Sequence, residues 1–402
     1  MYKKVIRYIL IAIALVPTSF FLLSAWFYAT CPIYKFSEPS PFTGEKLYNP
    51  YQNIDSTAWK KCIFHLHTKS WMGLTNGKNS FDDIIEVYRK LRYDVITISD
   101  YMKINRSGAA NPTYIPTYEH GYGTKKAHQL VLGASEVTWR DYFFSQNLNQ
   151  KQHIIDVLKK HCRLLAINHP NIRTAYLPAD FKYLSGYDLF ELQNGVRLSE
   201  IEWDSALSHG HQAWLIANDD AHSVDNLGLV QREMTFVNAP TATSENILEN
   251  LAKGAAFGLH IPHKKHADIA DKLHEAELIS MPVAIKLSAD TLQIAWRRTM
   301  SKIDFVGQGG QILKEVNDTC SADYLVKPED HYVRIRLFSP EGLVYYINPI
   351  IRYTGDSPEK QMLSSIDETR TLIKRVLILI ITLLGIGIIA IKQIKRLKHN
   401  RL

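Results

Sequence analysis

Hydrophobic and polar positions along the middle of the chain predict strands that alternate with helices. Short apolar runs typical of buried strands occur at 62–64, 94–99, 129–134, 164–168, 188–192 and 213–217. Between several of them, apolar residues recur at helical spacing, as in FDDIIEVYRKL, QKQHIIDVLKKH, SEIEWDSALSHG and SENILENLAKG. This alternation is typical of a parallel sheet covered by helices, either a barrel or an open doubly wound sheet. The number of strand–helix units favours a barrel.

After about residue 280 the pattern changes to strand-like runs joined by Gly, Pro and Asp turns. Such runs are typical of antiparallel strands. We therefore expect a barrel domain at 58–260 and a small β-rich domain at 281–355. The segment 261–280 lies between them, and its histidines are irregularly spaced. We interpret it as a solvated, partly helical connector rather than as a metal-binding tract.

Two long apolar runs lie near the ends of the chain. Residues 5–29 contain a single charge, Arg7, and residues 376–391 contain none. A bilayer core takes about 20 apolar helical residues, so we predict transmembrane helices at 5–29 and 371–392. A cleaved signal peptide is the alternative for the first run, and a buried core helix is the alternative for the second. The Pro-, Ser- and Gly-rich segment 30–57 is typical of a linker.

The positive charge of the chain is concentrated beside these apolar runs. The basic residues of the two ends account for more than the whole net charge of +7 and leave −3 for everything between them: Lys3, Lys4, Arg7, Lys374, Arg375, Lys392, Lys395, Arg396, Lys398 and Arg401. A mildly acidic middle does not support nucleic-acid binding. Because basic flanks stay in the cytoplasm, we predict a two-pass cell-membrane protein with both termini cytoplasmic and the main domain extracytoplasmic, in the periplasm.

Side chains able to bind metal follow most of the predicted strands. In parallel α/β folds the loops at the carboxyl ends of the strands converge on one face. In chain order these ends carry His65 and His67, then Ser99, Asp100 and Tyr101, then Glu136, His169, Gln193 and Asn194, and finally Asp219, Asp220 and His222. Each residue alone has an ordinary explanation, such as a turn donor or an N-cap. Together they indicate one site at one edge of the sheet.

These residue types favour a metal site. Histidine and carboxylate ligands suit zinc, manganese or iron, and the four cysteines show no paired spacing, so any disulfide stays unassigned. The single residue between His65 and His67 lets both imidazoles turn toward one ion at a fraying strand end. Glu136 is placed to bridge two ions. Bound metal polarises a phosphoryl oxygen and produces hydroxide near neutral pH, which suits hydrolysis of a phosphate ester.

The segments FHLHTKS, YDVITISDY, LVLGASEV, LLAINHP and IANDDAH resemble, in order and spacing, the motifs of the PHP (polymerase and histidinol phosphatase) family of metal-dependent phosphoesterases. The resemblance spans roughly residues 60–260 and implies a distorted (β/α)7 barrel followed by a small all-β domain. It implies these metal ligands, with Glu136 as the bridging glutamate: His65, His67, Glu136, His169, Asp220 and His222. We assign catalysis to Asp220 and His222, with His222 as a candidate acid or base.

The chain departs from the family pattern at three places. Tyr101 stands where the second motif usually ends in a histidine, and Tyr142 stands where a further histidine usually follows the glutamate. The segment TKSWMGLTNG after His67 lacks the additional histidine of trinuclear members. Because these departures fall on ligands beyond the core set, we expect one or two divalent ions, with Zn, Mn and Fe as the candidates.

Pattern and resemblance together predict a membrane-anchored, metal-dependent phosphoric ester hydrolase that acts outside the cytoplasm. Its expected partners are the bilayer and a small phosphorylated or lipid-linked substrate, and no nucleic acid. Arg140, Arg173 and Lys69 are candidate charge partners for that substrate. The alternatives are hydrolysis of a non-phosphate bond and a catalytically degenerate PHP-like module that binds metal or ligand without turnover.

Overall fold

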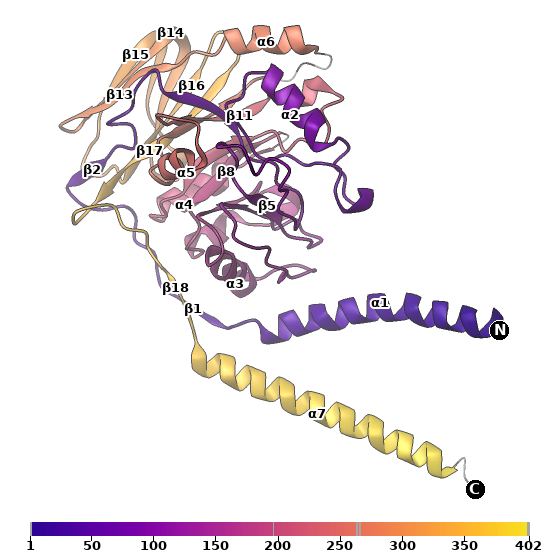
Figure 1. Cartoon of the computed structure of the whole chain (residues 1–402). Coiled ribbons are helices and arrows are strands. Elements are labelled where there is room, and N and C mark those ends of the chain that lie inside the picture. The colour runs from indigo at the N-terminus through magenta and orange to yellow at the C-terminus, as the bar shows by residue number, and fades with distance from the viewer. Residues whose placement is uncertain (1, 196, 263, 265–266, 400–402) are drawn as a thin grey trace.

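The computed structural model describes residues 2–195, 197–262, 264 and 267–399. Its strands form two large sheets, and long helices extend from both ends of the chain (Figure 1). The helices are α1 (Tyr2–Thr30), α2 (Phe81–Lys90), α3 (Leu148–Lys159), α4 (Glu200–Ser208), α5 (Ser244–Ala252), α6 (Ile269–Glu277) and α7 (Glu368–His399). The four helices predicted within the barrel region correspond to α2, α3, α4 and α5, so the helical spacing of apolar residues predicted these helices correctly.

The first sheet has six strands in the order β10-β8-β7-β6-β5, with β9 paired to β8. They are β5 (Thr117–His120), β6 (Gln129–Leu132), β7 (Leu164–Ile167), β8 (Leu189–Asn194), β9 (Arg197–Leu198) and β10 (Trp214–Asn218). The strands β7, β8 and β10 run parallel, whereas β6 is antiparallel to both β5 and β7. A short loop joins β5 to β6, and a connection of that length permits only antiparallel pairing.

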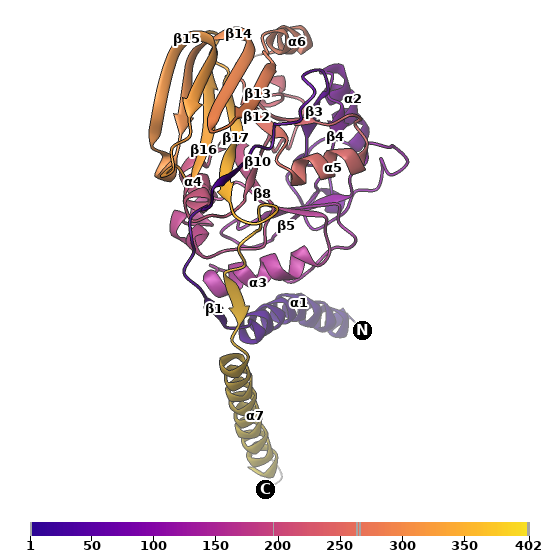
Figure 2. The same ribbon diagram turned by 90° about the vertical axis from the view of Figure 1, so that its left-hand side faces the viewer.

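The second sheet has ten strands in the order β13-β14-β16-β17-β12-β11-β3-β4, with β15 paired to β14 and β2 paired to β17 (Figure 2). They are β2 (Lys46–Tyr48), β3 (Trp59–Ile63), β4 (Val95–Ile96), β11 (Glu233–Asn238), β12 (Ala256–His260), β13 (Pro282–Ser288), β14 (Thr291–Val306), β15 (Ile312–Leu325), β16 (Tyr332–Phe338) and β17 (Val344–Tyr353). Because β17 pairs with β12, the strands after residue 280 continue a sheet that begins in the preceding region.

The structure has a mixed α/β fold, and it does not show the closed (β/α)7 barrel that the resemblance implies. The strands do not close into one hydrogen-bonded barrel. The two sheets meet through isolated bridges, Leu66 with Ala221 and Tyr101 with Glu119. Along its length β3 pairs with β11 instead of β10, and its end meets the segment after β10 at the Leu66 bridge. The bridges nevertheless bring the ends of β3, β4, β5 and β10 to one place.

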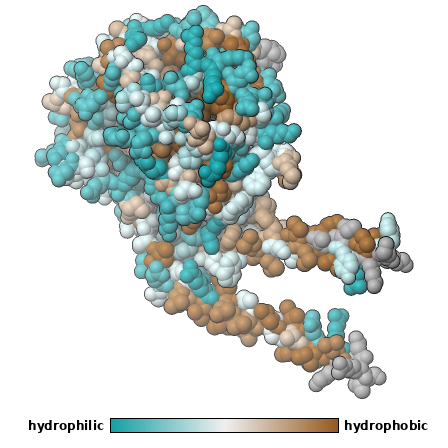
Figure 3. Space-filling view, in the orientation of Figure 1, coloured by the Kyte–Doolittle hydropathy of each residue, from teal (hydrophilic) through white to brown (hydrophobic). Residues whose placement is uncertain are grey.

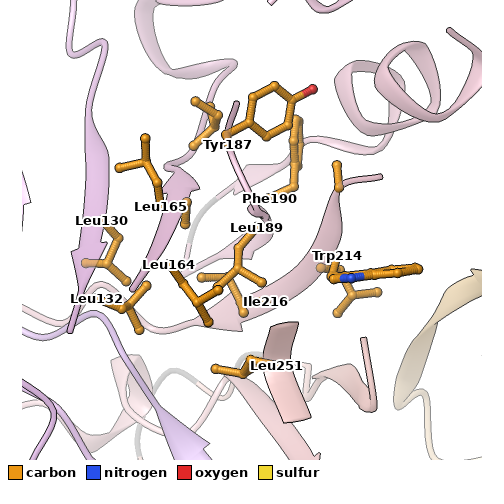
Figure 4. Close-up of a cluster of buried hydrophobic side chains, with 14 of the residues drawn as sticks. Leu130, Leu132, Leu164, Leu165, Tyr187, Leu189, Phe190, Trp214, Ile216 and Leu251 are labelled. Carbon is orange, nitrogen blue, oxygen red and sulfur yellow. The ribbon is translucent and has the colours of Figure 1, made fainter. Parts of the chain in front are cut away.

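The six-stranded sheet forms the centre of a hydrophobic core. The strands β6, β7, β8 and β10 are buried at every residue, which explains why the sequence shows continuous apolar runs here rather than alternation. Figure 4 shows how side chains from these strands meet those of α5: Leu130, Leu132, Leu164, Leu165, Leu189, Phe190, Trp214, Ile216 and Leu251. A tightly packed sheet of this kind holds the strand ends rigidly, which matters for the site below.

The helices α1 and α7 are long and apolar enough to cross a membrane. Their apolar side chains are exposed along most of their length, as the brown surface in Figure 3 shows. Strand β1 (Tyr34–Phe36) pairs with β18 (Ser364–Ile366), so the domain-side ends of both helices lie next to each other. From this neck α1 runs along the underside of the domain, and α7 points away from it (Figures 1 and 2).

The predicted linker is packed against the domain, and the predicted connector is partly helical. Within 30–57, Tyr51 is fully buried, and its hydroxyl donates to the Ala256 carbonyl at 2.5 Å and accepts from the Asn348 N–H at 2.8 Å. This aromatic residue therefore docks the segment onto the second sheet. Of the predicted connector 261–280, residues 263, 265 and 266 lie outside the described residues, and α6 occupies 269–277. The four cysteines are unpaired.

Candidate metal centre

Imidazole and carboxylate groups gather where the two sheets meet. They come from His65 and His67 after β3, Glu119 in β5, His128 before β6, His169 after β7, Glu191 in β8, and Asp220 and His222 after β10. All are buried except Asp220 and His222, which are partly exposed. Apart from Glu191, these residues form four overlapping groups of three, and within each group the ligand atoms lie within 4.8 Å of one another. The cluster is thus open to solvent on the side of Asp220 and His222.

The end of β3 is held in an extended path that points both of its histidines into the cluster. The Phe64 N–H donates to the Asn218 side chain at 2.8 Å, and the His67 N–H donates to the Ala221 carbonyl at 3.0 Å. On the other side, the Thr68 N–H donates to the Asp100 carboxylate at 2.8 Å. Segments after β4 and β10 therefore fix this strand end, and residues i and i+2 face the same side.

Glu119 stands at the centre, and each of its carboxylate oxygens faces two histidines. Its Oε2 lies 3.3 Å from His65 Nε2 and 3.2 Å from His67 Nε2. Its Oε1 lies 2.7 Å from His128 Nδ1 and 3.0 Å from His169 Nε2. Asp220 Oδ1 completes the first half of the site, which is the set formed by His65, His67 and Glu119 Oε2. It lies 3.3 Å from His65 Nε2 and 3.1 Å from His67 Nε2. This is the geometry of a carboxylate shared between two neighbouring ligand sets.

The buried oxygens of this cluster fit a bound cation. Glu119 Oε2 and Asp220 Oδ1 are both buried, and neither makes a hydrogen bond within the part of the chain that the structure describes. Buried polar atoms without a partner are rare and costly, so such a pair needs an explanation. Both oxygens face the same two imidazole nitrogens, of His65 and His67, which are good ligands for zinc and related metals. The residues present therefore suit a divalent metal ion.

The electrostatics of the cluster also suit a cation. Burial acts to lower the pKa of His65, but the charges of Asp220, Glu191 and Glu119 outweigh burial and hold this pKa well above its usual value. Burial acts to raise the pKa of Glu119, yet the imidazoles of His128 and His65 hold it well below its ordinary range. Without metal the site thus attracts a proton to His65, and a metal ion would take its place.

Glu191 orients His65 from behind. Its Oε1 lies 2.9 Å from His65 Nδ1, which leaves the Nε2 of that ring turned toward Glu119 and Asp220. The carboxylate also accepts hydrogen bonds from the Asn218 side chain at 2.9 Å, the His169 N–H at 3.0 Å and the Asn194 side chain at 3.0 Å. A carboxylate behind a ligand histidine fixes the ring and its tautomer.

We expect Glu191→Gln to weaken metal binding about 10- to 100-fold. Donors surround both oxygens of Glu191, so a glutamine amide turns its NH2 group toward a donor in either orientation. Competition with a fluorescent chelator on the purified protein measures this affinity. Glu202→Gln is the matched control, because Glu202 is a buried carboxylate of α4 outside the cluster. Equal affinities in the two variants would contradict the role of Glu191.

His222 and Tyr101 form the more open side of the site. The Nδ1 of His222 donates to the Asp220 carbonyl at 2.8 Å, so its Nε2 is unprotonated and accepts from the Tyr101 hydroxyl at 3.3 Å. The Tyr101 ring stacks on His67 with centroids 4.3 Å apart. Burial, and then the charge of His67, lowers the pKa of His222. His222 is therefore neutral near pH 7, as a proton acceptor or metal ligand requires.

The structure brings together every predicted site residue except Glu136. The Glu136 side chain is 64% exposed, and its carboxylate pairs with His161 at 3.0 Å, away from the cluster. The physical reason is the direction of β6. Because β6 is antiparallel to its neighbours, its carboxyl end, and with it Glu136, emerges at the opposite edge of the sheet. The central carboxylate is Glu119, on the short strand β5 that the sequence patterns missed.

The same strand direction corrects the interpretation of Tyr142. Its hydroxyl hydrogen-bonds His153 at 2.6 Å outside the site. The later histidine that contacts the central glutamate is His128, which stands just before β6 and so at the site edge. A signal was present in YEHGYGTKKAH, where a glutamate in a strand-like run precedes a histidine across a glycine-rich turn. Asp219 is structural, since it accepts backbone N–H groups from Gln231 and the two residues after it.

The predicted charge partners lie around the site rather than in it. Arg140 stands over the Phe27 ring at 4.7 Å and donates to Thr30, so it is engaged with α1. Arg173 donates to the Thr124 carbonyl at 2.9 Å, and Lys69 is exposed. Lys126 was not predicted, but its Nζ lies 5.1 Å from the centre of the Tyr101 ring. It is thus a cation next to the open side of the cluster.

Comparison with protein-family models finds no match for this chain, and no curated protein matches it. Among solved structures, the chain is similar to the crystal structure of a two-domain protein containing a predicted PHP-like metal-dependent phosphoesterase from Bacteroides vulgatus ATCC 8482. The match covers 76% of this chain and 99% of the other, with 16% identity and a TM-score of 0.38. At so low a TM-score the likeness supports no functional conclusion, which has to come from the geometry of the site.

Proposed function

We propose that the protein is a membrane-anchored, metal-dependent phosphoesterase that acts outside the cytoplasm. The observation that carries this proposal is the arrangement around Glu119, whose two oxygens each face a pair of histidines while Asp220 closes the first half. Two adjoining ligand sets of histidine and carboxylate suit one or two ions of zinc, manganese or iron. Paired sites of this type are common in enzymes that hydrolyse phosphate esters.

Each residue of the cluster has a definite part in this chemistry. His65, His67, Glu119 and Asp220 would hold one ion, and His128 and His169 would hold a second beside Glu119. A divalent ion there supplies Lewis-acid polarisation of the phosphate and lowers the pKa of water. His222 offers an unprotonated Nε2 at the open side, where it can take a proton from water or return one to the leaving oxygen. Lys126 is placed to attract a phosphate anion.

The anchoring and orientation belong to the same proposal. The basic residues at both ends of the sequence favour cytoplasmic termini and a periplasmic domain. Lys374 and Arg375 lie at the domain end of α7, where positive charge runs against that orientation. Both side chains donate to carbonyls at the end of α1: Lys374 to Tyr28 and Cys31, and Arg375 to Thr30. Their charge stabilises a helix carboxyl end, which accounts for their position.

The test is direct measurement of metal and turnover on the purified full-length protein. We expect at least one tightly bound divalent ion per chain, removable by a chelator, and hydrolysis of p-nitrophenyl phosphate or its diester analogue that is lost with the metal and restored by Zn²⁺ or Mn²⁺. A protein without bound metal and without hydrolysis would refute the proposal. A reporter fused after Leu402 should be active only in the cytoplasm, and an extracytoplasmic signal would refute the orientation.

A binding module without turnover is the second candidate, and one observation favours it. Tyr101 packs flat on His67 and covers one side of that ring with a phenol that burial keeps protonated, since burial raises the pKa of this hydroxyl. The Tyr101 phenol therefore narrows the path by which a substrate would reach the proposed metal ions past His67. Bound metal without any phosphate ester hydrolysis in the test above would support the binding module.

A further inference from the structure

An apolar pocket adjoins the candidate metal centre on the side of α1. Its volume is about 720 Å³. One wall is the helix α1, through Phe20, Leu23 and Phe27, and the opposite wall is made by the loops after β3 and β6, through Trp71, Leu74 and Trp139. The volume is enough for a long hydrocarbon chain, and the lining is the kind that such a chain prefers.

One residue of the pocket lining, Tyr101, also contacts the metal centre. Tyr101 lines the pocket, stacks on His67 at 4.3 Å and lies 3.3 Å from His222. Lys126 also lines the pocket, and its Nζ is 5.1 Å from the Tyr101 ring. The apolar pocket therefore borders a cation and, through Tyr101, the histidine and carboxylate cluster. A molecule with a hydrocarbon chain and an anionic head matches that order of surfaces.

The loops around the pocket present large apolar side chains to solvent. Leu74 is 85% exposed, Met72 is 100% exposed and Trp139 is 55% exposed. Trp71 and Trp139 meet edge to face with ring centroids 5.8 Å apart, and the Trp71 ring N–H donates to the Tyr101 carbonyl at 2.8 Å. Exposed apolar clusters mark membrane or partner contacts, and tryptophan in particular favours the lipid–water boundary.

The position of the pocket along α1 places it at that boundary. The apolar run Val5–Thr30 has 26 residues. At about 1.5 Å per residue it is about 39 Å long, which exceeds a hydrocarbon core of about 30 Å. The pocket lies on the half of α1 nearest the domain, where Phe20 packs edge to face on Phe143 at 5.1 Å. Its mouth therefore adjoins the outer layer of lipid.

We infer that the substrate is a phosphate ester of a membrane lipid, whose hydrocarbon chain lies in this pocket while its phosphate reaches the metal centre past Lys126. The inference rests on the proposed phosphoesterase activity. In the reaction the oxygen of water bonds to phosphorus, the bond from phosphorus to the ester oxygen breaks, and that oxygen leaves as an alcohol carrying a proton from the water. The site thus works on a molecule that stays anchored in the bilayer.

Alkyl phosphates of increasing length test this inference. The full-length protein is placed in bilayer discs of a galactolipid, which carries no phosphate and so neither reacts nor competes at the metal centre. We expect kcat/KM to rise at least about tenfold from ethyl to octyl phosphate, because each methylene moved out of water contributes up to about fourfold. Binding is measured separately, as quenching of tryptophan fluorescence by dodecyl phosphate with bromine at the chain end, since Trp71 and Trp139 line the pocket.

Two aspartate substitutions on one exposed turn provide matched variants. Leu74 lines the pocket, and Met72 does not, although both are exposed. We expect Leu74→Asp to reduce the octyl-to-ethyl ratio and the affinity for the brominated probe at least about tenfold, and Met72→Asp to leave both at wild-type values. An aspartate that lines the apolar pocket loses water when a hydrocarbon chain binds, which has a large desolvation cost. The same aspartate outside the pocket stays in water.

The outcomes separate the two proposals. Hydrolysis of ethyl phosphate without any gain for octyl phosphate and without quenching would overturn the lipid-chain pocket and leave the phosphoesterase standing. Equal effects of Leu74→Asp and Met72→Asp would also overturn it. Quenching that is lost only in Leu74→Asp, with no hydrolysis of any phosphate, would support the chain pocket and refute the phosphoesterase.

Discussion

Glu119→Gln is expected to reduce both metal affinity and kcat/KM for a phosphate ester by at least about a hundredfold. Loss of a residue that only supports a ligand costs up to about a hundredfold, and Glu119 is itself a proposed ligand. The substitution removes the negative charge that the two halves of the site share. It also turns an NH2 group toward one pair of imidazoles, either His65 and His67 or His128 and His169. A ligand that serves both halves cannot be replaced by a neighbour, so both ions are affected at once.

Metal content by mass spectrometry and initial rates at saturating metal check this prediction. Glu136→Gln is the matched control, because it makes the same chemical change at the glutamate that the motif pattern pointed to, on an exposed side chain that pairs with His161. We expect wild-type metal content and rate in that control. Loss of metal in Glu136→Gln with retention in Glu119→Gln would reverse the assignment made from the structure.

Arg334→Met is expected to destabilise the domain by about 3–5 kcal/mol, the usual cost of leaving a buried charge without its partner. Arg334 is 1% exposed, and its guanidinium donates to both Asp204 oxygens at 2.7 and 2.8 Å and to Glu200 at 2.7 Å. These acids lie at α4, whereas Arg334 lies on β16. The substitution therefore leaves the buried Asp204 carboxylate of α4 without its charge partner on the second sheet.

Chemical unfolding of the purified protein, followed by tryptophan fluorescence, measures the loss. Arg297→Met is the control, since Arg297 is an exposed arginine of the same sheet, and we expect a change within about 0.5 kcal/mol. Arg334→Met combined with Asp204→Leu should regain much of the lost stability, because the unpaired charge is then gone. An Arg334→Met protein as stable as the Arg297→Met control would show that the ion pair does not hold the two sheets together.

The sequence was a good guide to the elements that depend on neighbouring residues. The helical spacing in the barrel region correctly placed α2, α3, α4 and α5, and the apolar runs correctly placed β3, β4, β6, β7, β8 and β10. The candidate ligands His65, His67, His169, Asp220 and His222 do lie together. They could be found because parallel strands carry their functional groups at one predictable edge. Their binding of metal stays a prediction until it is measured.

The errors share one physical cause. Periodicity shows that a segment is a strand, but it does not show which way the strand runs relative to neighbours that are distant in sequence. For β6 this direction decides which of its ends meets the site, and so exchanges Glu136 for Glu119 and Tyr142 for His128. Strand β5 has the sequence TYEH, which contains no apolar run that could mark it as a strand.

By itself, therefore, the sequence determined the local elements, the two apolar terminal helices and most of the histidines and acids of the cluster, because each depends on spacing along the chain. Tertiary structure alone decided that Glu119 is central, that β3 pairs with β11 instead of closing a barrel, and that the pocket beside α1 opens next to Tyr101. Those features depend on pairing and packing between distant segments, which no local pattern of residues encodes.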